Sequence, residues 1–198
     1  MSNGHLLSIY PSLIRKGDAA IYKRERIRTD DDDFLDLDWS QQGNRRLAII
    51  SHGLEGDSYR PYVLGMVRAV NKAGWDALAW NFRSCSGEMN RQLRFYHSGS
   101  TDDLDRVVRH ASGQYSYDKI ALIGFSMGGN LTLVYLGEKG SGLDGMIEKA
   151  VVFSVPCDLK SSACELSKFR NILYMKRFLN LLHKKIRAKM ANCKNCPT

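Results

Sequence analysis

The spacing of apolar residues changes repeatedly along this chain. Residues 47–51 form a short, continuously apolar run, which is typical of a strand buried on both faces of a parallel sheet. Apolar residues then recur at helical spacing, at Val63, Val67 and Val70, before a predicted stop at Gly74. The other expected strands cover residues 75–82, 119–124 and 150–154, and the other expected helices cover residues 100–113 and 128–136. Strands that alternate with helices predict an α/β fold, with a mostly parallel sheet and helices on both faces.

The N-terminal part of the pattern predicts a hairpin. The stretches "AAIYKRERIRT" and "FLDLDWS" each indicate a strand, and they flank the acidic run from Asp30 to Asp33. We expect this run to be a solvated turn. Farther along the chain, Ser100 stands three residues before Asp103, which is the spacing of a capping box and predicts where the next helix begins.

The last part of the chain has a different pattern and most of the charge. Its apolar residues recur at helical spacing without a further strand, which predicts one or two amphipathic helices. The chain has a formal net charge of +8, and ten Lys or Arg residues lie from Lys160 onward, against Glu165 alone. The part before Lys160 is therefore close to neutral. We expect a core over residues 1–159 and basic helices with a tail over residues 160–198.

One glycine-flanked serine carries the clearest chemical signal. Gly124, Ser126 and Gly128 form a G-x-S-x-G pattern, entered by an apolar strand and left by a helix. A serine on such a sharp turn is typical of a nucleophile elbow, and the N-terminus of the following helix favours developing negative charge. The alternative interpretation is a turn that is rich in glycine for packing reasons alone.

A second motif, "SHGLEG", directly follows the strand over residues 47–51. Acyl transfer needs backbone N–H donors that face the oxyanion of the intermediate. In a fold of this kind one donor follows the nucleophile, here Met127, and the other lies in the loop after an earlier strand, here Leu54. His52 precedes Ser126, whereas the order expected for the triad is serine, acid, histidine, so we expect His52 to shape the loop.

The motifs together resemble a known family. The stretches "SHGLEGDSYRPYVLGM", "NFRSCSGEMNRQLRFYHSGSTDDL" and "GFSMGGNLTLVYLGEKG" are similar to the three signature blocks of the YheT-like branch of α/β hydrolases, and "GHLLSIYPSLIR" resembles its N-terminal segment. The resemblance covers about residues 4 to 180. It implies an α/β-hydrolase sheet, an esterase or acylglycerol-lipase type of activity on a small-molecule or lipid ester, and no cofactor. It also assigns Ser126 as the nucleophile, with Leu54 and Met127 as the oxyanion donors.

The same resemblance leads us to expect an incomplete catalytic set. The family has a lid of helices after its sixth strand and then two further strands, which deliver the acid and the histidine. By this resemblance, residues 150–154 are the sixth strand and the basic helices from about residue 160 begin the lid. The chain stops before the two further strands, so we expect it to be truncated.

The chain offers few candidates of its own for the missing base. His183 follows Ser126, with Asp158 between them, so the order of a triad is formally present. Two lysines adjacent to His183 disfavour the imidazolium that a general base becomes, and an ordinary amphipathic position also explains this residue. We expect His97 to shape its loop. Cys85 has no base beside it in the sequence.

Composition restricts location and metal binding. The chain has 198 residues, of which 43% are hydrophobic, enough for the core of one domain. No apolar run approaches the ~20 residues of a membrane-spanning helix. Five cysteines, an odd number, and no export signal predict reduced thiols and a cytoplasmic location. Cys193 and Cys196 have the spacing of a zinc knuckle, but structural zinc needs four ligands, so we expect no metal.

Two other functions stay open at this point. The chain could be an inactive hydrolase fold that binds a partner, or its basic helices could bind a membrane surface through residues 160–190. A solvated basic face is the simpler interpretation of those helices. Since the core is nearly neutral, we expect no nucleic acid partner, and the sequence leaves the oligomeric state undetermined.

Overall fold

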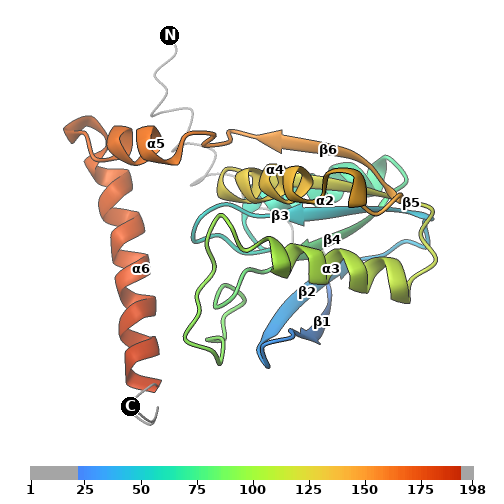
Figure 1. Cartoon of the computed structure of the whole chain (residues 1–198), viewed down its shortest axis with the longest axis horizontal. Coiled ribbons are helices and arrows are strands. Elements are labelled where there is room, and N and C mark those ends of the chain that lie inside the picture. Colours follow the sequence, from blue (N-terminus) through green and yellow to red (C-terminus); the bar gives the residue numbers. More distant parts are fainter. Residues whose placement is uncertain (1–21, 193–198) are drawn as a thin grey trace.

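Six strands form one sheet in the computed structural model, which describes residues 22–192 (Figure 1). Their spatial order is β1-β2-β4-β3-β5-β6. The strands are β1 (Lys23–Arg28), β2 (Phe34–Ser40), β3 (Arg46–Ser51), β4 (Asp76–Trp80), β5 (Lys119–Phe125) and β6 (Ile147–Phe153). The α-helices are α2 (Pro61–Lys72), α3 (Thr101–Gln114), α4 (Met127–Lys139), α5 (Leu159–Leu166) and α6 (Ile172–Asn192), with short 3-10 helices η1 (Gly140–Gly142) and η2 (Phe169–Asn171).

The pairing of the strands confirms the expected fold class. β3 runs parallel to both β4 and β5, and β6 runs parallel to β5. β1 and β2 form the predicted antiparallel hairpin, and β2 joins it to β4, also antiparallel. The result is an α/β fold with a mostly parallel sheet.

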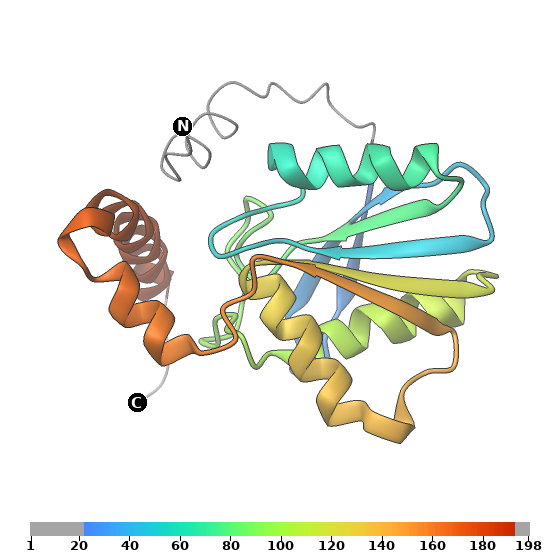
Figure 2. The same ribbon diagram turned by 90° about the horizontal axis from the view of Figure 1, so that it is seen from above.

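Helices cover both faces of this sheet, with α2 on one side and α3 and α4 on the other (Figure 2). The two faces explain the continuous apolar run of β3. Leu47 and Ile49 pack in the core cluster that includes residues of α3 and α4, whereas Ala48 and Ile50 pack in the cluster that includes residues of α2. Fully burying such an aliphatic side chain contributes about 1.5–3 kcal/mol. The strand that leads to the "SHGLEG" loop is therefore held from both sides.

The last strand of the described sheet has an open side. β6 pairs with β5, and no other described strand pairs with it. Val151 and Phe153 are 49% and 40% exposed, unusual for apolar residues of a parallel strand. Beyond β6 the chain leaves the sheet through α5 and α6, and α6 stands apart from the sheet in both views (Figures 1 and 2). Among the described helices, none is long and apolar enough to cross a membrane.

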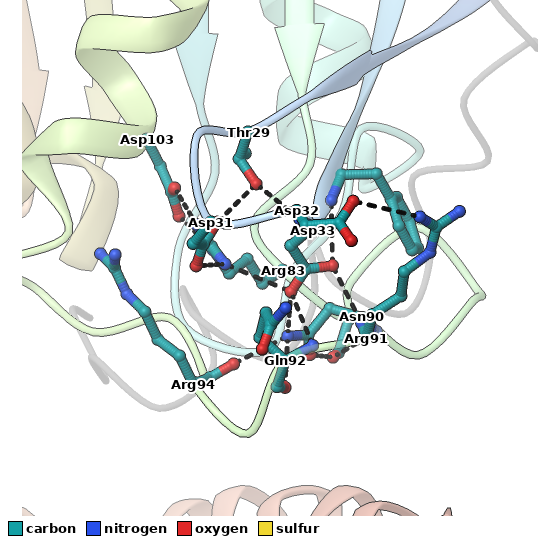
Figure 3. A network of polar contacts seen from close by, with 12 residues as sticks. Thr29, Asp31, Asp32, Asp33, Arg83, Asn90, Arg91, Gln92, Arg94 and Asp103 are labelled. Carbon is teal, nitrogen blue, oxygen red and sulfur yellow. Dashed lines mark hydrogen bonds and ion pairs between the residues drawn. The ribbon is translucent and has the colours of Figure 1, made fainter.

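The acidic turn between β1 and β2 is not merely solvated, contrary to our expectation (Figure 3). Asp33 is fully buried, and its carboxylate accepts a hydrogen bond from Asn90 at 2.6 Å and two more from backbone N–H groups of the loop after β4. Asp31 accepts two hydrogen bonds from Arg83, at 2.7 and 3.1 Å. These bonds lower the pKa of Asp31 to about 2. The carboxylates of this turn therefore hold the loop at 81–100 through hydrogen bonds.

Arg83 joins this turn to α3. Its guanidinium donates to Asp103, in the first turn of α3, at 2.9 and 2.7 Å, and both side chains are buried. Burial raises the pKa of Asp103, although the positive charge of Arg83 opposes that shift. The predicted capping box is therefore wrong, because the Asp103 carboxylate accepts its hydrogen bonds from Arg83 and not from the backbone of Ser100. Ser100 makes no side-chain cap, and its Oγ accepts the N–H of His97 at 3.1 Å.

Arg83→Met should leave the buried carboxylate of Asp103 without its counter-charge. Breaking a buried ion pair by removing one partner costs about 3–5 kcal/mol, so we expect the free energy of unfolding in urea to fall by that amount at neutral pH. Burial raises the pKa of Asp103 in the folded state, and protonation removes the unpaired charge. The deficit should therefore shrink as the pH falls toward about 4, the pKa of an unfolded aspartate.

Arg94→Met is the matched control in the same loop. Arg94 pairs with Asp102, whose side chain is 59% exposed, and an exposed ion pair contributes about 0–1 kcal/mol. An equal loss for both variants, or a deficit of Arg83→Met that does not change with pH, would contradict the assignment of Arg83 as the buried counter-ion.

Candidate active site

Ser126 lies at the junction of β5 and α4, with an unusual backbone conformation. Its φ is 52° and its ψ is −117°, and its side chain is exposed. A positive φ at a residue other than glycine costs about 1–3 kcal/mol and persists only where the surroundings hold it. Here the N–H of Ser126 donates to the carbonyl of Phe153 at 2.8 Å, and its carbonyl accepts from Asn130 at 3.0 Å. The junction has the strand–turn–helix form that the sequence predicts.

The flanking glycines are required by close backbone contacts. A Cβ added to Gly124 would lie 2.6 Å from the carbonyl oxygen of Gly128. A Cβ on Gly128 would lie 2.6 Å from the carbonyl oxygen of Ser51 and closer still to that of His52. Since real Cβ atoms keep at least 3.0 Å from such neighbours, no side chain fits at either position. The start of α4 is therefore packed directly on the end of β3.

The loop after β3 is held by hydrogen bonds at almost every residue. His52 is buried, its Nε2 accepts the N–H of Phe82 at 3.1 Å, and its Nδ1 donates to the carbonyl of Gly53 at 2.8 Å. Burial lowers the pKa of His52 to about 3. The N–H of Gly53 donates to the hydroxyl of Tyr62 at 3.0 Å. Both ring nitrogens of His52 are occupied, so this histidine shapes the loop, as the sequence predicts.

The three predicted site residues line one cavity. Leu54, Ser126 and Met127 all border a space of about 550 Å³. Its other walls come from the loop at 95–98, from α5 and from α6, and most of them are apolar, including Phe178 and Leu182. The cavity could hold an apolar group beside the hydroxyl of Ser126.

The backbone N–H groups of Leu54 and Met127 lack hydrogen-bond acceptors among the described residues, although most residues around them are hydrogen-bonded. Neither group donates to any residue in the described part of the chain. Met127 is the first residue of α4, where N–H groups have no partner within the helix. Two donors of this kind beside one serine form an arrangement that can stabilise an oxyanion.

None of the described histidines is placed as a general base for Ser126. His97 lines the same cavity, but its Nδ1 accepts the N–H of Gly99 at 3.1 Å. In the neutral ring the proton is therefore on Nε2, which makes that nitrogen a donor. His183 is exposed on α6 and does not line the cavity, and Asp158 instead caps α5 through the N–H of Ser161. The formal series of Ser126, Asp158 and His183 is not brought together.

A polar cluster beside Leu54 was not predicted from the sequence. Glu55 is buried with a φ of 53°, and its Oε1 accepts from the hydroxyl of Tyr96 at 2.5 Å and from Lys185 at 3.0 Å. Lys185 also contacts the Sγ of Cys85 at 3.1 Å. Burial raises the pKa of Cys85 to about 11, so its thiol stays protonated near neutral pH. Through Lys185 the cluster fastens α6 to the loop that carries Leu54.

Metal binding has no support in this region. In the part of the chain that the structure describes, no group of three His, Cys, Asp or Glu side chains is arranged to hold a metal ion. Cys193 and Cys196 lie outside the described residues.

Comparisons with known proteins show the family of this chain. The sequence profile of the alpha/beta hydrolase fold family matches residues 49–161. The chain is 34% identical over 194 residues to the putative esterase YheT of Escherichia coli, covering 96% of this chain and 56% of that protein. It is 31% identical over 167 residues to the human phospholipase ABHD3, covering 80% of this chain and 40% of that protein. The chain thus spans about half, or less, of the length of these curated relatives.

A solved structure shows the same arrangement of elements. An esterase from Pyrococcus furiosus, Pf2001, superposes with a TM-score of 0.62 at 25% identity, covering 75% of this chain and 57% of that chain.

Gly128→Ala should disturb the contact between α4 and the loop after β3. The new Cβ would collide with the backbone carbonyls of Ser51 and His52, which cannot move as a flexible side chain does. We expect a loss of about 1–3 kcal/mol or more in the free energy of unfolding, measured in urea.

Gly137→Ala is the control in the same helix. No atom lies within 4 Å of a Cβ at Gly137, so alanine there should stabilise the protein by about 0.5–1 kcal/mol. If Gly128→Ala were as stable as the unaltered protein, the close contact would not be what fixes the turn.

Proposed function

Because the chain belongs to the alpha/beta hydrolase fold family, we propose that it acts on carboxylic esters with Ser126 as the nucleophile and the N–H groups of Leu54 and Met127 as the oxyanion site. The observation that supports this proposal is the shared cavity. It places an exposed serine in a strained turn, two backbone N–H groups without described partners and an apolar volume of about 550 Å³ next to one another.

The proposed reaction begins with attack of the Ser126 Oγ on the ester carbonyl carbon. As the new C–O bond forms, the carbonyl oxygen becomes an oxyanion that accepts hydrogen bonds from Leu54 and Met127. One such donor is worth about 10²–10³ in rate in enzymes of this mechanism. The positive end of the α4 dipole, at Met127, adds to the same stabilisation. The alcohol then leaves with a proton, and water releases the acid from Ser126. No step of this reaction uses a cofactor.

The apolar walls of the cavity favour an ester with an acyl chain. Phe178 and Leu182 of α6 and Leu159 and Leu166 of α5 line the space beside Ser126. Similar proteins carry the names esterase and phospholipase, which fits a lipid or other acyl ester as the substrate class.

The described histidines near Ser126 are engaged in other hydrogen bonds and do not accept the proton of its hydroxyl. His52 has both ring nitrogens engaged, and the Nδ1 of His97 accepts from Gly99. His110 binds Glu25 at 3.0 Å, away from the cavity. Among the described histidines, none is therefore positioned to act as the base for Ser126.

A fluorophosphonate should attach covalently to Ser126. We expect labelling of the folded full chain, located by mass spectrometry of its peptides, and loss of the label in Ser126→Ala. Ser98 lines the same cavity, so Ser98→Ala is the matched control and should keep the label. A folded protein that takes no label would instead favour an inactive fold that binds a partner, and a label on Ser98 would contradict the assignment of the nucleophile.

His97→Ala should slow this labelling by less than about tenfold, because its Nδ1 is engaged by Gly99. Removal of a true general base costs about 10²–10⁴ in rate. The measurement is the labelling rate against pH, with His110→Ala as the control for a histidine outside the cavity. A drop of a hundredfold or more in His97→Ala alone would show that His97 is the base.

A further inference from the structure

α6 carries a concentration of exposed positive charge. The helix contains six Lys or Arg residues and no acidic residue. Lys185 and Lys189 turn toward the rest of the molecule, where they contact Glu55 and the carbonyl of Asn90. The other four are exposed, and none of them forms an ion pair with a described residue; they are Lys176, Arg177, Lys184 and Arg187.

Exposed apolar residues lie beside this charge. Leu179, Ile186 and Met190 are 41%, 45% and 67% exposed. Their spacings of seven and four residues put them on one side of the helix. Near the start of α6, Leu173 is 75% exposed, and Phe169 in η2 is 87% exposed. One side of the helix lines the cavity through Phe178, Leu182 and Ile186, and the exposed Leu179 and Met190, which do not line it, lie next to that side.

We propose that α6, together with η2, is a binding surface for a lipid bilayer that contains anionic headgroups. Lys176, Arg177, Lys184 and Arg187 would lie among lipid phosphates, and the exposed apolar residues would enter the boundary between headgroups and acyl chains. A helix of this composition, basic on one side and apolar on the next, is typical of a segment that lies in the plane of a membrane surface. Long basic side chains reach the headgroups while their stems rest on apolar groups.

A bilayer fits these observations better than a nucleic acid does. Phosphates of either partner would satisfy the four basic residues. Only the bilayer also removes Leu179 and Met190 from water, and the part of the chain before Lys160 adds no positive field because it is nearly neutral. The exposed apolar side therefore decides between the two partners.

The surface would also bring the cavity close to lipid. α6 supplies Phe178, Leu182 and Ile186 to the wall of the cavity that Ser126 borders, so a bilayer bound at α6 would lie beside that cavity. The binding surface does not include Ser126, so membrane binding can be tested whether or not the proposed hydrolysis occurs.

The test is co-sedimentation of the full chain with vesicles. One set is made of phosphatidylcholine alone and the other of equal parts phosphatidylcholine and phosphatidylglycerol. We expect binding to the second set only, weakened by added salt, because salt screens the basic residues. Each basic residue near such a surface is worth roughly fivefold in affinity, so Lys176→Gln with Lys184→Gln should weaken binding by more than about tenfold.

Two further variants complete the test. Lys72→Gln with Lys149→Gln removes the same charge from exposed positions on α2 and β6 and should change binding by less than about twofold. Leu179→Gln with Met190→Gln should also weaken binding, because it removes apolar contacts. Equal effects of the two lysine pairs, equal binding to both vesicle sets, no effect of the apolar pair, or binding to duplex DNA without binding to vesicles would each overturn the proposal.

Discussion

The candidate site depends on a contact between two backbones that leaves no space for side chains. The turn that carries Ser126 meets the start of the loop that carries Leu54 at Gly128, where even one added carbon would overlap the carbonyl groups of Ser51 and His52. This contact sets the start of α4 against the end of β3 and holds Ser126 in a conformation that a non-glycine residue seldom adopts. The continuous burial of β3 from both faces makes the contact rigid. The serine and the two N–H groups are thus positioned by the sheet itself.

Side-chain contacts over long distances in the sequence build the rest of the cavity. Arg83 ties the hairpin turn and α3 to the loop at 81–100, which supplies the wall at 95–98 (Figure 3). Glu55 accepts hydrogen bonds from Tyr96 of that loop and from Lys185 of α6. The loop wall and the α6 wall of the cavity therefore meet next to Leu54. A change that loosens either wall should reach the loop that carries Leu54 through Glu55. The polar groups around the cavity therefore position the apolar ones.

The sequence predicted what depends on neighbouring residues and missed what depends on distant ones. The run at 47–51, the stop at Gly74 and the turn at Ser126 follow from local spacing, and the structure has all three. The contact of Lys185 with Glu55 joins residues 130 positions apart, and no local pattern signals it. The capping box at Ser100 failed for the same reason, because a side chain from another element took the Asp103 carboxylate.

The structure of a phosphonate adduct would test the arrangement of nucleophile and oxyanion site together. We expect a bond from the Ser126 Oγ to phosphorus, with the phosphoryl oxygen within hydrogen-bonding distance of the N–H groups of both Leu54 and Met127. Its apolar substituent should lie between Phe178 and Leu182. An adduct on Ser126 whose phosphoryl oxygen faces away from both N–H groups, or is held by a side chain instead, would contradict the proposed oxyanion site.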